Sequence, residues 1–211
     1  HTKYDVDIVK AVRGKLLQES AIRALVQNIA SCDEVWVVSR GAGENLRSLG
    51  YEGDYIVMEN GVDVPRGRVS DEAIAAATGR YDLPQNVPVF LFVGRLMWYK
   101  GIRIILDALK TLREKNVDFR MVFIGEGADG AEIRSYAEER KLSDRCFFTG
   151  AISDREIIRA WYGRSDLFLF PSTFDTNGLV VREAAASGTA TVMIRNSCAS
   201  EGVGDGRNGF C

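Results

Sequence analysis

Two cationic side chains stand at the junction between an apolar run and a helical segment. Arg95 directly follows the run "VFLFVG", and Lys100 directly precedes the segment "GIRIILDALK". A helix N-terminus attracts anions, and cations beside it add charge-assisted hydrogen bonds. The pattern therefore fits a cradle for a diphosphate. The competing interpretation, a pair of solvated surface charges, fits the sequence about equally well.

Two carboxylates stand near the start of a later helix. In "FDTNGLVVREAAASG", Asp175 lies in a loop and Glu183 lies in the following helix, with seven residues between them. Carboxylates only accept hydrogen bonds, so they suit hydroxyl-rich ligands such as a sugar or a ribose diol. The alternative makes Asp175 a helix N-cap and Glu183 a solvated helix residue. Taken alone, these two residues favour that alternative.

A glycine-rich loop, "GEGADG" at residues 125–130, has the spacing Gly-x-Gly-x-x-Gly between an apolar run and a helical segment. This context is that of a dinucleotide-binding turn, and it makes a Rossmann-type oxidoreductase one candidate. Such an enzyme needs an acidic residue at the end of the next strand to hold the ribose. The stretch "CFFTGAIS" offers none before Asp154, so the oxidoreductase is the weaker alternative.

Regular alternation of apolar strands and amphipathic helices fills residues 88–211. We expect strands at 89–95, 119–125, 146–150, 167–172 and 189–194, and helices at 101–115, 131–142, 153–163 and 178–188. Strands that are apolar throughout and alternate with helices predict a doubly wound parallel α/β sheet covered on both faces. Ligands bind such sheets at the carboxyl ends of the strands, where the cations, the carboxylates and the glycine loop all lie.

The preceding residues predict the end of another α/β domain. A long amphipathic helix runs from about residue 5 to 30 with Gly14 as an interruption, and Ser39 is placed to cap a helix between two strands. We assign residues 1–61 to this amino-terminal domain, 62–87 to a polar hinge and 88–211 to the ligand-binding domain. Both ends of the chain look truncated, since it starts at His1 and stops just after an Asn-Gly turn.

Bulk composition sets broad limits on function. The chain has 211 residues, 46% of them hydrophobic and 27% charged, with a net charge of -2. That balance gives no overall attraction to nucleic acid, and no run of apolar residues reaches the length of a spanning helix. Four separated cysteines without a Cys-x-x-Cys pair argue against a zinc site or a disulfide framework. We expect a cytoplasmic protein, with peripheral contact at the inner face of the membrane left open.

An ordered set of motifs covers nearly the whole chain. They are "CDEVWVVS", "VMENGVDV", "FVGRLMWYKG", "FTGAIS", "LFLFPSTFDTNGLVVREAAASG" and "DGRNGF". In this order the set resembles the retaining nucleotide-sugar glycosyltransferases of the GT-B fold, the glycosyltransferase group 1 family. The resemblance implies a Rossmann-like GT-B carboxy-terminal domain plus the last elements of a truncated amino-terminal domain. It also implies transfer of a hexose from a nucleotide diphosphate sugar, such as a UDP- or GDP-sugar, with retention of configuration.

The family pattern assigns roles to individual residues. Its Glu-x7-Glu signature falls on Asp175 and Glu183, so Asp175 would hold the transferred sugar with one methylene less reach, and Glu183 would hold the ribose diol. Arg95 and Lys100 would bind the donor diphosphate and stabilise the leaving nucleotide. The remaining donor contacts implied by the resemblance fall on Asn177, Gly178 and Leu179 around the sugar and phosphates, and on Ala151 and Ile152 beside the base.

The first residues carry two further assignments. "HTKYD" resembles the acceptor-side loop of family members, which makes His1 a candidate near the transferred sugar; a remnant of a purification tag is almost as good an explanation. Asp5-Val6-Asp7 mimics an Asp-x-Asp metal motif, but it opens a helix, so we expect no metal and no other cofactor.

Several expectations follow for the protein as a whole. Its partners would be the nucleotide-sugar donor and a sugar or lipid acceptor, with no nucleic acid and with a homodimer as an option. The 211 residues alone should bind donor weakly and turn over nothing, because the acceptor half forms the other wall of the cleft. A catalytically idle binding subunit is a third alternative. Among the aromatic residues, Trp36 and Trp161 should be core, while Trp98 could contact an acceptor or another domain.

Overall fold

The computed structural model describes residues 8, 9 and 11–211. His1 and the Asp5-Val6-Asp7 motif lie outside these residues, so the assignments made to them stay predictions. Within the described part, none of the helices is long and apolar enough to cross a membrane.

The largest element is a six-stranded parallel sheet in the order β5-β4-β3-β6-β7-β8. Its strands are β3 (Val89–Val93), β4 (Arg120–Ile124), β5 (Cys146–Gly150), β6 (Leu167–Phe170), β7 (Ala190–Met193) and β8 (Gly209–Phe210). The central strands are buried on both faces; Leu91, Phe92, Val122 and Phe123 are fully inaccessible to solvent. Such two-sided burial explains why these strands are apolar throughout.

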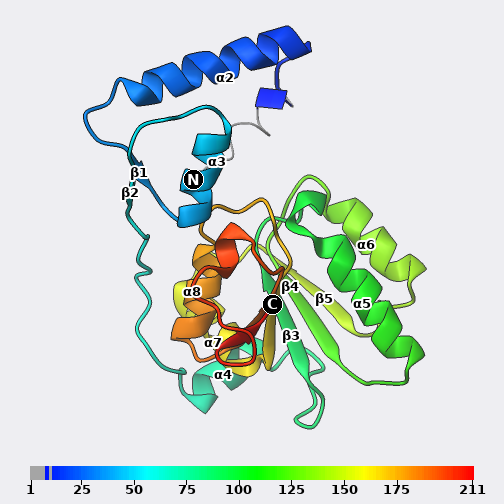
Figure 1. The fold of residues 1–211 in the computed structure, drawn as a ribbon. Helices are drawn as coiled ribbons and strands as arrows, with labels where there is room; N and C mark the ends of the chain where they lie inside the picture. The colour runs from blue at the N-terminus through cyan, green and yellow to red at the C-terminus, as the bar shows by residue number, and fades with distance from the viewer. Residues whose placement is uncertain (1–7, 10) are drawn as a thin grey trace.

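Helices cover both faces of the sheet (Figure 1). Helices α5 (Ile102–Glu114) and α6 (Gly130–Glu139) lie on one face, and α4 (Asp71–Thr78), α7 (Arg155–Arg164) and α8 (Leu179–Ala186) lie on the other. The 3-10 turns η1 (Trp98–Lys100) and η2 (Cys198–Ser200) lie in loops that follow β3 and β7. The doubly wound α/β fold expected from the sequence is confirmed, and Trp161, with 1% of its surface exposed, belongs to its core.

The chain reverses its direction across the sheet beside β3. From β3 it moves outward through β4 to the edge strand β5, then returns to place β6 on the other side of β3. The connections from β3 and β6 therefore run to opposite faces of the sheet, and their first residues diverge from a crevice between the two strand ends. In open α/β sheets this switch point is where ligands bind.

A smaller unit precedes the sheet and contains α2 (Lys15–Ala30), β1 (Trp36–Val37), α3 (Arg40–Ser48) and β2 (Ile56–Val57). Strands β1 and β2 pair in parallel, and the Ser39 hydroxyl accepts a hydrogen bond from the Ala42 N–H, which confirms the expected cap. The prediction that Trp36 is a core residue is wrong. Its side chain lies on the face of β1 opposite the buried Val37 and is 59% exposed, because this small sheet is packed on one face only.

The segment expected to be a hinge contains a helix. Ser70 caps α4, and α4 packs against α7 through the buried Ile74. At least the second part of residues 62–87 is thus attached to the large sheet, while the residues before it cross between the two units as an extended chain (Figure 1). The domain boundaries themselves remain a prediction.

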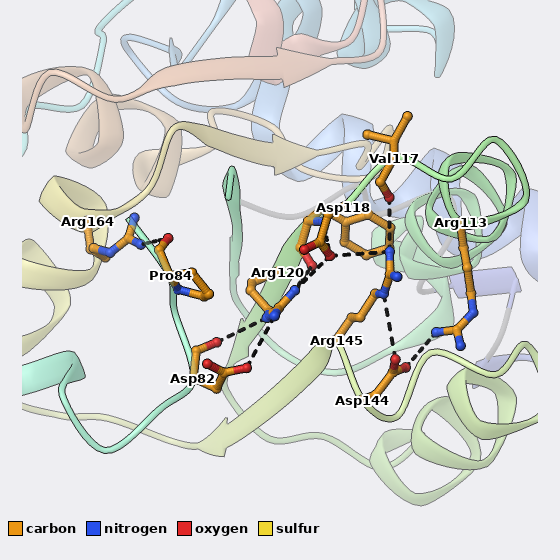
Figure 2. A network of polar contacts seen from close by, with 10 residues as sticks. Asp82, Pro84, Arg113, Val117, Asp118, Arg120, Asp144, Arg145 and Arg164 are labelled. Carbon is orange, nitrogen blue, oxygen red and sulfur yellow. Dashed lines mark hydrogen bonds and ion pairs between the residues drawn. The ribbon is translucent and has the colours of Figure 1, made fainter. Parts of the chain in front are cut away.

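A polar network ties the loops at the amino-terminal edge of the sheet, opposite the switch point (Figure 2). Arg120, at the start of β4, donates to the Asp82 carbonyl at 3.1 Å and to the Asp118 carboxylate at 2.9 Å. Arg145 donates to the Val117 carbonyl at 3.0 Å and lies 3.4 Å from Asp118. The network fixes where β4 and β5 begin and leaves the opposite edge free of it.

The network makes a stability prediction. We expect Arg120→Ala to lower the free energy of unfolding by about 1–2 kcal/mol, because the Arg120 side chain is only 12% exposed and its loss would leave the carbonyl partners without a donor. Arg155 is a matched control, since its ion pair with Asp63 is 70% and 100% exposed, and Arg155→Ala should change stability by less than about 0.5 kcal/mol. Urea unfolding of both variants is the measurement, and equal losses would contradict the prediction.

Candidate functional site

Lys100 and Asp175 meet at the switch point. Lys100 ends the turn η1 after β3, and Asp175 lies in the loop after β6, so 75 positions of sequence separate two residues that share one crevice. The Lys100 Nζ lies 2.5 Å from Asp175 Oδ1, and the two side chains are 10% and 21% exposed. The sequence analysis placed both residues at the ligand edge, and the structure brings them into direct contact.

Asp175 is held through both carboxylate oxygens. Oδ1 accepts from Lys100, and Oδ2 accepts a hydrogen bond from the hydroxyl of the fully buried Ser172. Asp175 is not the N-cap of α8, because Gly178 occupies that position with φ 61°. The interpretation of Asp175 as a simple helix cap is therefore wrong. The sequence did not single out Ser172. A hydroxyl three residues before a carboxylate in one loop is nevertheless a recognisable signal for a local hydrogen bond.

A cavity of about 230 Å³ opens beside this ion pair. Its walls are the carboxyl ends of β3 and β6 and the first residues of α8; the lining residues are Val93, Gly94, Lys100, Phe170, Asp175, Thr176, Asn177, Gly178, Leu179 and Val180. The first residues of α8 line the cavity, so the positive end of the helix dipole faces it, and no side chain caps this N-terminus. The cavity thus presents a cation, a helix N-terminus and a carboxylate to one ligand.

Arg95 lies on the same loop as Lys100 but outside the cavity wall. Its side chain is exposed, and its guanidinium carbon lies 5.8 Å from the centre of the Tyr99 ring. The Lys100 ammonium lies 5.5 Å from the same ring, so both cations flank one aromatic side chain. An anion larger than the cavity could reach Arg95 while it contacts Lys100.

Glu183 is not part of the cavity wall. It lies in the second turn of α8, and one of its oxygens accepts a hydrogen bond of 3.3 Å from the buried Tyr162 hydroxyl on α7. Burial, with the charge and the hydrogen bond of Glu183, raises the pKa of Tyr162 well above its ordinary value. The phenol therefore stays protonated and remains a donor to Glu183. Asp175 precedes α8 and Glu183 lies within it, but only Asp175 lines the cavity.

Asn177 connects the site to the smaller unit. Its side-chain amide donates to the Val38 carbonyl at 2.6 Å and accepts from Arg182 at 3.2 Å. Beside it, the Ser39 hydroxyl donates to the Thr176 carbonyl at 2.6 Å. The Asn177 side chain thus faces the β1–α3 turn, which leaves the backbone of residues 176–179 to face the cavity.

The remaining predicted residues lie farther from the ion pair. Ala151 and Ile152 follow the edge strand β5, two strands away from β3; Ala151 is exposed, and Ile152 packs partly against the core. Trp98 packs edge-on against Tyr136 of α6 with Arg103 over its ring, so its contacts are with the helices of its own sheet. Among the described residues, no group of three or more His, Cys, Asp or Glu side chains is arranged to hold a metal ion.

Solved structures that resemble this chain in fold include GT-B glycosyltransferases. The Anabaena protein HepE, in complex with UDP-glucose, has a TM-score of 0.79 at 23% identity, covering 91% of this chain and 53% of that one. Sucrose-phosphate synthase from Thermosynechococcus elongatus has a TM-score of 0.76 at 24% identity, covering 96% of this chain and 51% of that one. These likenesses assign the chain to the GT-B fold class.

The sequence model of the family described as "Glycosyl transferases group 1" matches residues 75–211, and the chain belongs to that family. A GDP-mannose-dependent alpha-(1-6)-phosphatidylinositol dimannoside mannosyltransferase of Mycobacterium tuberculosis is 35% identical over 205 residues, covering 95% of this chain and 51% of its own length. An alpha-monoglucosyldiacylglycerol synthase of Streptococcus pneumoniae is 23% identical over 200 residues, covering 93% and 45%. The chain spans about half the length of these relatives. The oxidoreductase alternative gains no support from any of these matches.

The buried ion pair makes a prediction of its own. Removing Lys100 as Lys100→Met leaves a mostly buried carboxylate without its cation, so we expect a loss of about 1–3 kcal/mol in unfolding free energy. The double variant with Asp175→Asn should lose less than the sum of the two single variants. The exposed pair Lys110–Glu114 provides the control cycle, with an expected coupling below about 0.5 kcal/mol. Urea unfolding gives both couplings, and equal values would contradict the prediction.

Proposed function

We propose that the full-length protein is a retaining hexosyltransferase that uses a nucleotide diphosphate sugar and transfers the hexose to a sugar or lipid acceptor. The observation that carries this proposal is the Lys100–Asp175 pair in the cavity at the GT-B switch point. One member suits a phosphate and the other suits a hydroxyl, which are the two kinds of group that adjoin in a sugar diphosphate.

The donor would lie along the carboxyl ends of β3 and β6. Lys100, Arg95 and the N-terminus of α8 supply positive charge where the diphosphate leaves, which stabilises the charge that develops on the departing nucleotide. Because these groups supply that charge, we propose a reaction that needs no metal ion. Asp175, fixed by Lys100 and Ser172, would accept hydrogen bonds from the transferred sugar.

The acceptor is proposed from the relatives. The names of two of them include a phosphatidylinositol dimannoside and a diacylglycerol. A lipid acceptor would favour a cytoplasmic enzyme with peripheral contact at the inner face of the membrane. Donor hydrolysis by the full-length protein would exclude the alternative of an idle binding subunit.

A donor screen tests the proposal. We expect one class of nucleotide sugar, UDP- or GDP-linked, to raise the melting temperature of the full-length protein at millimolar concentration, while NADH should not. The Lys100→Met variant should lose the response, because it lacks the cation that contacts the diphosphate. A rise in melting temperature with NADH alone would contradict the proposal and support the oxidoreductase alternative.

Glu183 provides a narrower test. If its carboxylate takes the ribose diol, Glu183→Ala should weaken UDP or GDP binding about ten- to a hundredfold, the worth of charged hydrogen bonds of roughly 1.5–3 kcal/mol. Glu138→Ala, at an exposed position of α6, is the matched control and should bind like the unaltered protein. Calorimetry on the full-length protein is the measurement, and unchanged affinity of Glu183→Ala would remove Glu183 from the donor site.

A further inference from the structure

The loop 125–130, "GEGADG", lies against the loop that carries Arg95 and Lys100. It follows β4, the strand next to β3, and none of its residues lines the cavity beside the ion pair. Instead it meets the neighbouring loop backbone to backbone. The Leu96 N–H donates to the Glu126 carbonyl at 3.0 Å, and Leu96 itself is anchored in the core with 1% of its surface exposed.

Two of the three glycines are required by this contact. A Cβ on Gly125 would lie 2.0 Å from the Gly94 carbonyl oxygen, and a Cβ on Gly127 would lie 2.4 Å from the Leu96 carbonyl oxygen. Both obstacles are backbone atoms, which no side-chain rotation can move. Gly130 differs, because its Cβ would meet only the Leu96 side chain at 3.7 Å, an ordinary contact distance. The glycines of the first two positions therefore allow two loops to touch.

Asp129 adds a directed contact to the same loop. Its carboxylate accepts a hydrogen bond of 2.8 Å from the Trp98 N–H, the first N–H of the turn η1 that ends in Lys100. That turn has no side-chain cap from its own N-cap residue, Met97, so Asp129 supplies the acceptor from the neighbouring loop. On the other side, Gly101 packs against the Pro171 carbonyl at a distance that leaves no room for a Cβ.

We propose that Gly127 and Asp129 are positioning residues for donor binding: they hold the loop 95–100 so that Lys100 faces the cavity and Arg95 stands beside it. In this role the Gly-x-Gly-x-x-Gly spacing serves the neighbouring loop and binds no nucleotide itself. The inference rests on the proposed function, since it concerns residues that position the donor-binding loop and do not contact the donor.

A pair of glycine variants in the full-length protein tests the steric part. Gly127→Ala must push the Leu96 backbone away, so we expect UDP or GDP affinity to fall about ten- to a hundredfold, as displacement of a binding group by about an ångström does. Gly130→Ala adds the same methyl group three residues on, where α6 begins, without a clash, and should bind like the unaltered protein. Both variants are measured by calorimetry with UDP and with GDP, and by thermal unfolding.

A pair of Asp129 variants tests the directed contact and does not depend on how Gly127→Ala folds. Removing an anion near a diphosphate would by itself strengthen binding, so a loss of affinity in Asp129→Ala reports a displaced loop and not a changed charge. Asp129→Asn keeps an acceptor for the Trp98 N–H, and its affinity should equal or exceed that of the unaltered protein. We expect Asp129→Ala to bind about tenfold more weakly than Asp129→Asn, roughly the worth of one such hydrogen bond.

The outcomes separate the two levels of the proposal. Nucleotide binding at unaltered strength in folded Gly127→Ala, or equal affinities in Asp129→Ala and Asp129→Asn, would overturn the positioning role and leave the donor site in place. Failure of the unaltered full-length protein to bind either UDP or GDP would overturn the proposed function, and the positioning role with it.

Discussion

Strand β3 is hydrogen-bonded to β4 on one side and to β6 on the other, and this pairing places two diverging helices at one crevice. Helix α5 leaves toward one face and α8 toward the other, and each starts from a glycine in the left-handed region, Gly101 at φ 78° and Gly178 at φ 61°. Neither glycine has room for a Cβ. Gly178 and the first residues of α8 line the cavity, so the positive end of that helix dipole faces it, while α5 begins at Ile102, just after Lys100.

The fold was predictable where local pattern and packing agree. The strands of the large sheet are apolar throughout because both of their faces are buried, and that pattern is visible in the sequence. It failed at Trp36, where an apolar run is covered on one face only, and it missed α4, whose alanine-rich sequence has a single large apolar contact at Ile74. Periodicity cannot report how many layers will cover a short strand.

The site was predictable to the level of loops. Lys100 and Asp175 both follow strands of a parallel sheet, so their meeting at one edge was expected. Their direct ion pair, the support from Ser172 and the bond between Tyr162 and Glu183 were not, because each depends on side-chain direction across elements far apart in sequence. The glycine loop shows the reverse error, since a spacing typical of nucleotide contact here satisfies a steric demand between two loops.

The smaller unit is joined to the loops of the large sheet by hydrogen bonds at the start of α3. The Ser39 hydroxyl caps α3 through the Ala42 N–H while it donates to the Thr176 carbonyl, and Glu201 accepts from the N–H groups of Arg40 and Gly41 at 2.9 and 2.7 Å. Glu201, after β7, thus satisfies two N–H groups at the start of α3, and the Thr176 carbonyl, after β6, accepts from the hydroxyl that caps the helix. Any rearrangement between the units would expose these N–H groups as well as the apolar contacts.

The ion pair at the switch point also sets the electrostatic balance of the cavity. Because Lys100 is paired with Asp175, a small anion such as chloride or sulfate would have to compete with a carboxylate that Ser172 also holds. A ligand that carries both a phosphate and a hydroxyl can bond to Lys100 and to Asp175 at once, so that neither side chain is left without a partner. The pair therefore favours a ligand with both kinds of group over a ligand with a single kind.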